Sequence, residues 1–184
     1  MEAVWKEKLE ESAYRMGLAK AVKECRDEML PRAREMAAYA VQALSESNKS
    51  QLMKLERQAI STMAITDIYD YIKLRVGRSE SGKKWRHLDF GRKLLLELEG
   101  LEAKAEAKAK ELVDLNPLTR DLSAVKREMH LLLAREFIGQ MVSNYLYFLV
   151  EPKAAPKLDM GEERSRSNQL HQRHDNSPSR SRRR

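Results

Sequence analysis

The scarcity of chain-breaking residues is the feature of this sequence that most constrains its fold. Only seven glycines and five prolines occur in 184 residues. An all-β fold needs many turns, and turns are built largely from these two residue types. Long helices need no such interruptions. Because apolar residues still make up 42% of the chain, the sequence favours an all-α protein with a real core.

Apolar residues recur at helical spacing along the first 150 residues. The intervals predict successive helices over about 3–29, 31–44, 48–63, 66–77, 85–115 and 118–149. The fifth of these starts either near Trp85 or after Asp89 as its cap. Pro31 fits the first turn of the second helix, where its missing N–H costs nothing, and Asn116-Pro117 separates the last two helices in the same way. We expect those two longest helices to pair antiparallel. The sequence therefore predicts a compact bundle of five or six helices over residues 1–150.

The C-terminal segment has a different composition. Residues 151–184 show no apolar periodicity and are rich in Ser, Arg, Asn, Gln and His. Such a composition predicts a disordered basic tail that follows the helical domain. Short Arg/Ser runs bind RNA without specificity, but they also occur as plain chain ends, and we assign this tail no specific role.

Several features bear on the compartment. Cys25 is the single cysteine, so no internal disulfide framework exists, which points to a reducing environment. No stretch approaches the roughly 18 apolar residues of a membrane span. The N-terminus lacks the basic and apolar regions of a secretory signal. We therefore expect a soluble, cytoplasmic protein with no membrane contact.

Catalytic and metal-binding motifs are not recognisable. The four histidines, at positions 87, 130, 171 and 174, have neither HExxH spacing nor cysteine partners. The segment 81–84, Ser-Gly-Lys-Lys, lacks the rest of a phosphate-binding loop. His87 and Asp89 could form an acid–base pair, but a helix cap beside a surface histidine is the simpler explanation. We expect no enzyme activity, no metal and no cofactor.

The positive charge of the chain is concentrated in two regions. The formal net charge is +7, of which residues 71–93 carry +6 and residues 162–184 carry +4, so the rest of the chain is three charges negative. A mildly acidic body with two basic regions suggests a surface for anions. The alternative is a solvated face together with a solubilising tail.

The central basic segment also contains aromatic residues. Cations hold phosphates and rings stack on unpaired bases, so this mixture is typical of nucleic-acid binding. The expected contacts are Lys73, Arg75, Arg78, Lys83, Lys84, Trp85, Arg86, Arg92 and Lys93. The competing interpretation is that Trp85 and Phe90 attach the loop to the core and that the cations are merely solvated.

Two short runs carry a resemblance to a known family. Asn48-Lys-Ser-Gln-Leu52 opens a helix, and Ile68-Tyr-Asp-Tyr-Ile-Lys-Leu-Arg-Val-Gly-Arg78 follows about twenty residues later. Together, residues 48–78 resemble the small helical subunit of type III CRISPR–Cas effector complexes, in which a Ser-x-Gln-Leu/Ile-Arg helix start precedes a helix with a basic end. Met53 stands where that pattern has arginine.

The resemblance implies a non-catalytic subunit that acts in antiviral defence. Copies would stack along a backbone of larger subunits and line the guide–target duplex or the displaced strand with cations. The residues that match such contacts are Lys49, Lys54, Arg57, Arg75 and Arg78.

The sequence as a whole predicts a nucleic-acid-binding helical subunit of a ribonucleoprotein assembly. Its expected partners are single-stranded RNA or DNA, or a guide–target duplex, together with other protein subunits or further copies of itself. The alternative is a helical protein–protein adaptor without nucleic-acid contact. In that case the leucine seam of residues 94–115 would join a partner helix or a second copy.

Overall fold

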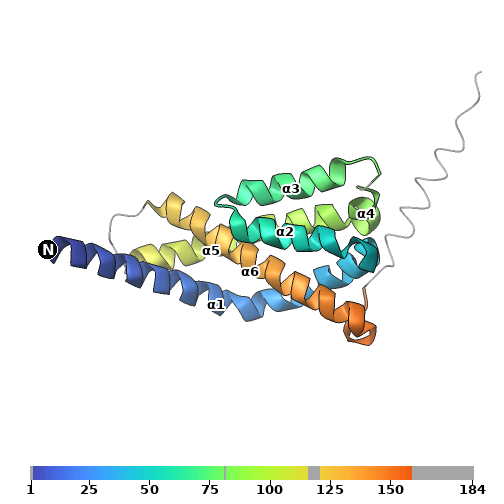
Figure 1. Cartoon of the computed structure of the whole chain (residues 1–184). Coiled ribbons are helices and arrows are strands. Elements are labelled where there is room, and N and C mark those ends of the chain that lie inside the picture. The colour runs from blue at the N-terminus through green and yellow to red at the C-terminus, as the bar shows by residue number, and fades with distance from the viewer. Residues whose placement is uncertain (1, 81, 116–120, 159–184) are drawn as a thin grey trace, which may run out of the picture.

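The chain folds into the expected bundle of helices. The computed structural model describes residues 2–80, 82–115 and 121–158, and it contains no strand over these residues. The α-helices are α1 Glu2–Leu44, α2 Lys49–Ser61, α3 Ile65–Gly77, α4 Lys83–Arg86, α5 Phe90–Leu115 and α6 Leu122–Val150, with short 3-10 turns η1 Glu46–Asn48, η2 His87–Asp89 and η3 Pro152–Ala154. Figure 1 shows α1 along the lower edge of the bundle, the α2–α3 hairpin along the upper edge, and α6 between them.

Residues 2–44 form one helix, so the predicted boundary at Pro31 was wrong. α1 runs for 43 residues with Pro31 inside it. A proline within a helix removes one hydrogen bond and bends the axis, but it does not end a helix that is held by neighbours on both sides of it. Met29 and Ala33 are both buried against the core. Figure 1 shows that α1 changes direction along its length.

The two long helices α5 and α6 pair antiparallel, as predicted. The Lys126 Nζ atom lies 2.9 Å from a Glu102 carboxylate oxygen and 3.1 Å from one of Glu106. One turn further along α6, His130 Nε2 lies 2.8 Å from the Leu98 carbonyl oxygen. As the residue number rises along α6, the number of its contact residue on α5 falls, so the two helices run in opposite directions.

The start of the last helix differs from the prediction. The Asp121 side chain caps α6 by accepting a hydrogen bond from the Ser123 backbone N–H at 3.2 Å. The helix therefore begins at Leu122 and not at about residue 118. The Asn116-Pro117 turn lies outside the described residues.

α1 packs against both of these helices and runs in the same direction as α6. The Tyr14 hydroxyl donates to Glu128 at 2.7 Å near the start of both helices, and the Arg34 guanidinium donates to the Ala154 carbonyl oxygen at 3.1 Å near their ends. Against α5 the direction is reversed. Three ion pairs follow this α1–α5 seam, Glu24–Lys108, Glu28–Lys104 and Arg32–Glu97.

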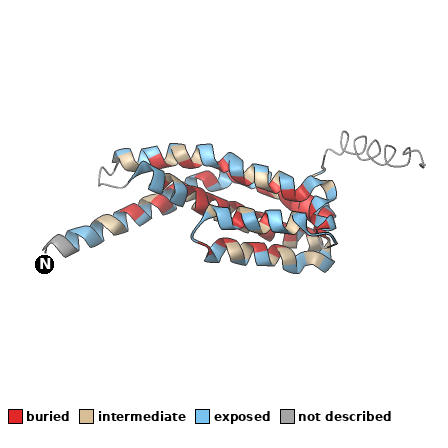
Figure 2. Cartoon of the chain, turned by 90° about the horizontal axis from the view of Figure 1, so that it is seen from above, coloured by how far each residue is buried: buried red, intermediate tan, exposed pale blue. Residues whose placement is uncertain are grey.

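The core contains most of the large apolar side chains of the helices. The largest side chains that are completely buried are Trp85, Tyr145, Phe90, Phe137 and Phe148. Figure 2 shows buried residues along the inner faces of the helices, and it shows the N-terminal part of α1 projecting beyond the others.

The packed part of the chain extends past the predicted domain end at residue 150. After α6, the chain makes one 3-10 turn, and Ala154, Ala155 and Leu158 pack against the core. The first eight residues of the expected tail therefore belong to the bundle. Residues 159–184 lie outside the described part.

Candidate nucleic-acid interface

Gln51 connects the helices that carry the predicted contacts. Its backbone carbonyl accepts a hydrogen bond from the Tyr71 hydroxyl at 3.0 Å, and its side-chain oxygen accepts one from Trp85 Nε1 at 2.6 Å. The Gln51 amide nitrogen donates to Asn48 at 2.8 Å, and Asn48 in turn donates to the Leu44 carbonyl at 3.0 Å. These bonds bring the end of α1, the start of α2, α3 and α4 together at one end of the bundle (Figure 1).

Trp85 belongs to the core, so its predicted role in stacking on bases was wrong. The side chain is completely buried, with the Phe90 ring 5.3 Å and the Tyr71 ring 6.4 Å away between centroids. An apolar ring of this size gains more from burial than from solvent contact, and its N–H has a partner inside. The alternative prediction, that Trp85 and Phe90 attach the basic loop to the core, is confirmed.

Arg86 makes hydrogen bonds to backbone carbonyls within the basic segment. Its guanidinium donates to the carbonyl oxygens of Val76 at 2.5 Å, Arg78 at 2.8 Å and Ser79 at 2.9 Å. These carbonyls lie at the end of α3, where helical backbone acceptors lack partners. A guanidinium engaged in this way holds the loop in shape, so the expected direct contact of Arg86 with nucleic acid does not fit its geometry.

The polypeptide turns sharply between α3 and α5. A Cβ atom at Gly82 would lie 2.1 Å from the Arg78 carbonyl oxygen, and one at Gly91 would lie 2.4 Å from the Val76 side chain. Leu88 and Asp89 have positive φ values of 53° and 55°. Because these two residues leave the helical conformation, α5 begins at Phe90. This start agrees with the predicted one directly after Asp89 and not with the other predicted one near Trp85.

Several predicted cations rest on aromatic rings. The Arg75 guanidinium lies 4.9 Å from the centroid of Tyr71, and the Lys73 ammonium lies 5.9 Å from that of Tyr69. Burial, followed by the charges of Glu99 and Glu102, raises the pKa of Tyr69 to about 12, so this ring stays neutral.

Three further predicted cations have local partners as well. Lys93 lies 3.9 Å from the Tyr39 centroid. Lys83 pairs with Glu80 at 2.9 Å. Arg92 lies 3.8 Å from Asp89, a long separation between exposed side chains that contributes little.

The remaining predicted cations have no ion pair in the part of the chain that the structure describes. They are all exposed, and they are Lys49, Lys54, Arg57, Arg78 and Lys84. Elsewhere in the bundle, lysines at the contacts between helices form ion pairs with glutamates. We use the name basic end for the exposed cations at the start of α2, the end of α3 and the starts of α4 and α5, namely Lys49, Arg78, Lys83, Lys84 and Arg92.

Lys54 and Arg57 extend this charge along α2. Together with Lys49 they line a shallow hollow of about 540 Å³, which Met53 also borders. The sequence predicted these cations, but it missed Gln51 and Gly82, which hold them in place. In the sequence, the one signal of this structural role was the position of Gly82 within a polar loop.

The groups considered for catalysis are in unremarkable surroundings. Cys25 is buried, and burial raises the pKa of its thiol. His130 is buried between Leu98 and Tyr69, and His87 is exposed. No group of three His, Cys, Asp or Glu side chains within the described residues could hold a metal ion. His171 and His174 lie outside that part of the chain.

Hydropathy gives no indication of a membrane span: none of the described helices is both long and apolar enough to cross a bilayer. Comparison of the chain with family models, with curated proteins and with solved structures finds no match.

Proposed function

We propose that this protein is a non-catalytic, cytoplasmic subunit of a ribonucleoprotein assembly and binds nucleic acid through the basic end. The observation that carries the proposal is the difference between paired and unpaired cations. Lysines of the interhelical seams contact carboxylates, whereas Lys49, Arg78 and Lys84 have no ion pair among the described residues. Exposed cations without counter-charges are the groups that replace the counterions of a phosphate backbone.

The proposed mode of binding is recognition of phosphates and not of bases. Trp85 and Phe90 are completely buried and Tyr71 is half-buried under Arg75, so the basic end offers no free ring for stacking. Phosphate contacts position a strand but carry no sequence information. We therefore expect binding to RNA or DNA of any sequence, as suits a subunit that lines a strand selected by another component.

The resemblance of residues 48–78 to type III CRISPR–Cas small subunits makes the proposed assembly more specific. The matching residues Lys49 and Arg78 both belong to the basic end, and Lys54 and Arg57 continue it along α2. In this form, copies of the chain would stand side by side in an effector complex of antiviral defence. Each copy would turn its basic end towards the guide–target duplex or the displaced strand.

Salt-dependent binding tests the proposal. A chain ending at Leu158 keeps all described packing and lacks the arginine-rich segment that follows. For a single strand, log K falls with log salt at about −0.7 per phosphate contact, so the triple change Lys49→Ala, Arg78→Ala and Lys84→Ala should flatten the slope by about 2 units. The control, Lys6→Ala, Lys20→Ala and Lys23→Ala, removes the same charge from exposed positions on α1 and should leave the slope unchanged. Equal slopes in the two variants would remove the basic end as the binding site.

The second candidate function is that of a protein–protein adaptor. Such an adaptor would bind its partner through a surface other than the leucine seam. Leu94, Leu98, Leu101 and Ala105 are buried in the chain's own core, so that seam is not free for a partner. Instead, the projecting part of α1 exposes Trp5 by 71%, Leu9 by 73% and Met16 by 70%. An exposed apolar stripe of this kind is a feature of interaction sites. A triple variant with an unchanged salt slope would put this candidate ahead.

A further inference from the structure

The N-terminal part of α1 extends beyond the helices that cover the rest of it. A Cβ atom at Gly17 would lie 2.8 Å from the Leu112 side chain, near the end of α5. Before that contact, residues 5–13 contain no buried side chain. Figure 2 shows this part of the helix projecting from the bundle. We use the name N-terminal arm for residues 5–20 of α1.

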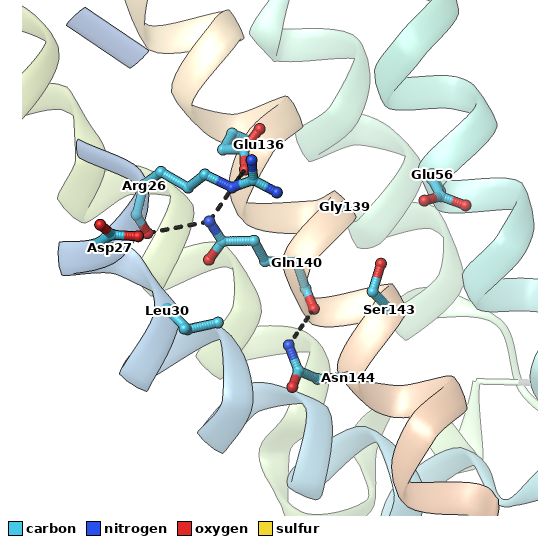
Figure 3. Close-up of a pocket in the computed structure, with 9 residues that line it drawn as sticks. All are labelled: Arg26, Asp27, Leu30, Glu56, Glu136, Gly139, Gln140, Ser143 and Asn144. Carbon is cyan, nitrogen blue, oxygen red and sulfur yellow. Dashed lines mark hydrogen bonds and ion pairs between the residues drawn. The ribbon is translucent and has the colours of Figure 1, made fainter. Parts of the chain in front are cut away.

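The helix that carries the arm is fixed to α6. Figure 3 shows the Arg26 guanidinium beside the Glu136 carboxylate, and the two groups lie 2.9 Å apart. The Gln140 side-chain amide donates to the Arg26 carbonyl oxygen at 3.1 Å. Within the arm itself, the Tyr14 hydroxyl donates to Glu128 at 2.7 Å. Because α1 continues through these contacts as one helix, the arm is held in a fixed direction.

The arm has apolar side chains on two opposite faces. Tyr14 and Leu18 face the bundle and are buried. At about 100° per residue, Trp5, Leu9 and Met16 lie on the other side of the helix, and all three are exposed. The positions of this outer seam alternate between steps of four and three residues, at Trp5, Leu9, Ser12, Met16 and Ala19. Such alternation is the a/d spacing of a coiled coil, so the outer seam is shaped for a second helix.

The charged residues that border this outer seam are all cations. With Leu9 and Met16 at a positions, the flanking e and g positions of the arm are Lys6, Lys8, Ala13, Arg15 and Lys20. The acidic residues Glu7, Glu10 and Glu11 fall at f, b and c positions, away from the seam. Although Arg15 pairs with Glu11 of its own helix, Lys6 and Lys8 have no ion pair among the described residues.

This border of cations determines which helix can cover the outer seam. Charges at e and g set partner choice in coiled coils, because like charges that face each other repel. Two arms of the same protein would bring cations opposite cations in either orientation, so a second copy is a poor occupant. The complementary occupant is a helix that has glutamate or aspartate at its own e and g positions.

We propose that the N-terminal arm docks an amphipathic helix of another protein whose apolar seam is bordered by acidic residues. The apolar side chains of that helix cover Trp5, Leu9 and Met16, and one of them enters the space above the small Ser12. This proposal specifies the partner that the second candidate function leaves open. The basic end takes no part in it.

Two synthetic peptides test the docking on the full chain after nucleic acid has been removed at high salt. The acidic peptide has three repeats of Glu-Ile-Ala-Ala-Leu-Glu-Lys, which place glutamate at every e and g position. The basic peptide has three repeats of Lys-Ile-Ala-Ala-Leu-Lys-Glu. In titration calorimetry, the acidic peptide should bind one to one and at least about tenfold more tightly than the basic one, because several flanking pairs change sign.

Tryptophan fluorescence shows whether the peptide covers the arm. Trp5 is exposed whereas Trp85 is completely buried, so docking changes the surroundings of Trp5 alone. The acidic peptide should shift the emission to shorter wavelength and protect it from acrylamide, and Trp5→Phe should remove both effects. Leu9→Ser with Met16→Ser should weaken binding by more than about tenfold, since two apolar side chains no longer leave water.

Charge reversal separates docking from general attraction between the basic protein and an acidic peptide. Lys6→Glu, Lys8→Glu and Lys20→Glu should reverse the preference, so that the basic peptide binds more tightly. The control makes the same change at exposed lysines outside the arm and should keep the acidic preference; it is Lys73→Glu, Lys153→Glu and Lys157→Glu. Circular dichroism checks that each variant keeps its helices.

Several outcomes would overturn the docking proposal. Equal affinity for the two peptides would do so, as would a charge-reversed arm that still prefers the acidic peptide. A dimer that dissociates on Trp5→Ala would identify a second copy as the occupant. Binding to vesicles of phosphatidylcholine and phosphatidylglycerol that needs Trp5, without binding of the acidic peptide, would assign the arm to a lipid surface. The salt slope of nucleic-acid binding does not depend on the arm, so the two proposals fail separately.

Discussion

Gln51 stabilises the structure of the basic end, although the sequence shows it only as one of several polar residues of α2. It accepts from the indole N–H of Trp85, a side chain that is completely buried. Replacing Gln51 with methionine keeps the volume and the helix propensity but leaves that N–H without a partner. An unsatisfied buried donor costs about 1–3 kcal/mol.

We therefore expect Gln51→Met to lower the free energy of unfolding by about 1–3 kcal/mol in urea titrations. Gln58→Met, seven residues later on the same helix, is the matched control, because its side chain makes no hydrogen bond among the described residues. Equal stability of the two variants would show that the Trp85 N–H finds another acceptor.

Gly82 allows the closest approach of backbone to backbone in the basic segment. Any side chain there meets the Arg78 carbonyl, at 2.1 Å from the first carbon, and the Arg75 carbonyl at 2.8 Å. Backbone cannot move aside as a flexible side chain can, so Gly82→Ala should destabilise the protein by about 1–3 kcal/mol.

Gly100 gives the opposite expectation. Its surroundings are open and it lies inside α5, so Gly100→Ala should stabilise the protein by about 1 kcal/mol through helix propensity. Thermal unfolding of the two alanine variants compares them directly. A Gly82→Ala protein as stable as Gly100→Ala would mean that the turn after α3 is looser than these distances indicate.

Single residues also mark where sequence reasoning succeeds and fails. The helical period identified the buried faces because it depends only on neighbours three and four positions apart. It could not separate Trp85 in the core from Trp5 in solvent, since both occur at plausible apolar positions. That difference depends on which distant helix lies opposite, and α1 extends beyond its partners at Trp5.

The helix α1 illustrates the same limit for whole elements. Local rules stop a helix at proline, and the prediction accordingly divided α1 at Pro31. Contacts across the bundle overrode the rule, because α5 and α6 hold both halves of α1 in place. The predicted start of α6 failed for a related reason, since a cap at Asp121 depends on turn geometry that apolar spacing does not report. For α5, the reversal at Leu88–Asp89 selects the later of the two predicted starts.

The ladder of charges between α1 and α5 should make stability depend on pH. Hydrogen bonds from Lys108 and Lys104, followed by their charges, lower the pKa values of Glu24 and Glu28. A carboxyl whose pKa is lowered by folding stabilises the protein above its unfolded pKa, and this contribution is lost as pH falls through the folded value. We expect the free energy of unfolding to decline between about pH 5 and pH 3.

Replacing the two lysines distinguishes the contribution of this seam to the pH dependence from that of the other carboxylates. Lys104→Met with Lys108→Met returns the two glutamates towards their ordinary pKa values, so the decline in acid should become shallower. Lys49→Met with Lys54→Met removes the same charge from lysines that have no ion pair in the described chain, and its decline should follow the wild type. Identical acid profiles for all three proteins would rule out a contribution from the α1–α5 seam.

For the whole molecule, the described part of the C-terminal segment closes one end of the bundle. Ala154, Ala155 and Leu158 pack on the core, and Arg34 donates to the Ala154 carbonyl. A chain ending at Val150 loses this hydrogen bond and the partial burial, and should be less stable than a chain ending at Leu158 by about 1–3 kcal/mol. Urea midpoints of the two truncated chains measure the difference, and coincident curves would show that residues 151–158 only rest on the surface.

The order of the helices along the chain also has a consequence for synthesis on the ribosome. α1 is made first, yet its main partner α6 begins at Leu122. At about 5–20 residues per second, the buried face of α1 waits for roughly 4–20 seconds before α6 is available. During that interval Leu18, Met29 and Met36 are exposed on a nascent helix. We therefore expect α1 to be protected by chaperones, or by pairing with α1 of another nascent copy, until the C-terminal half of the chain is complete.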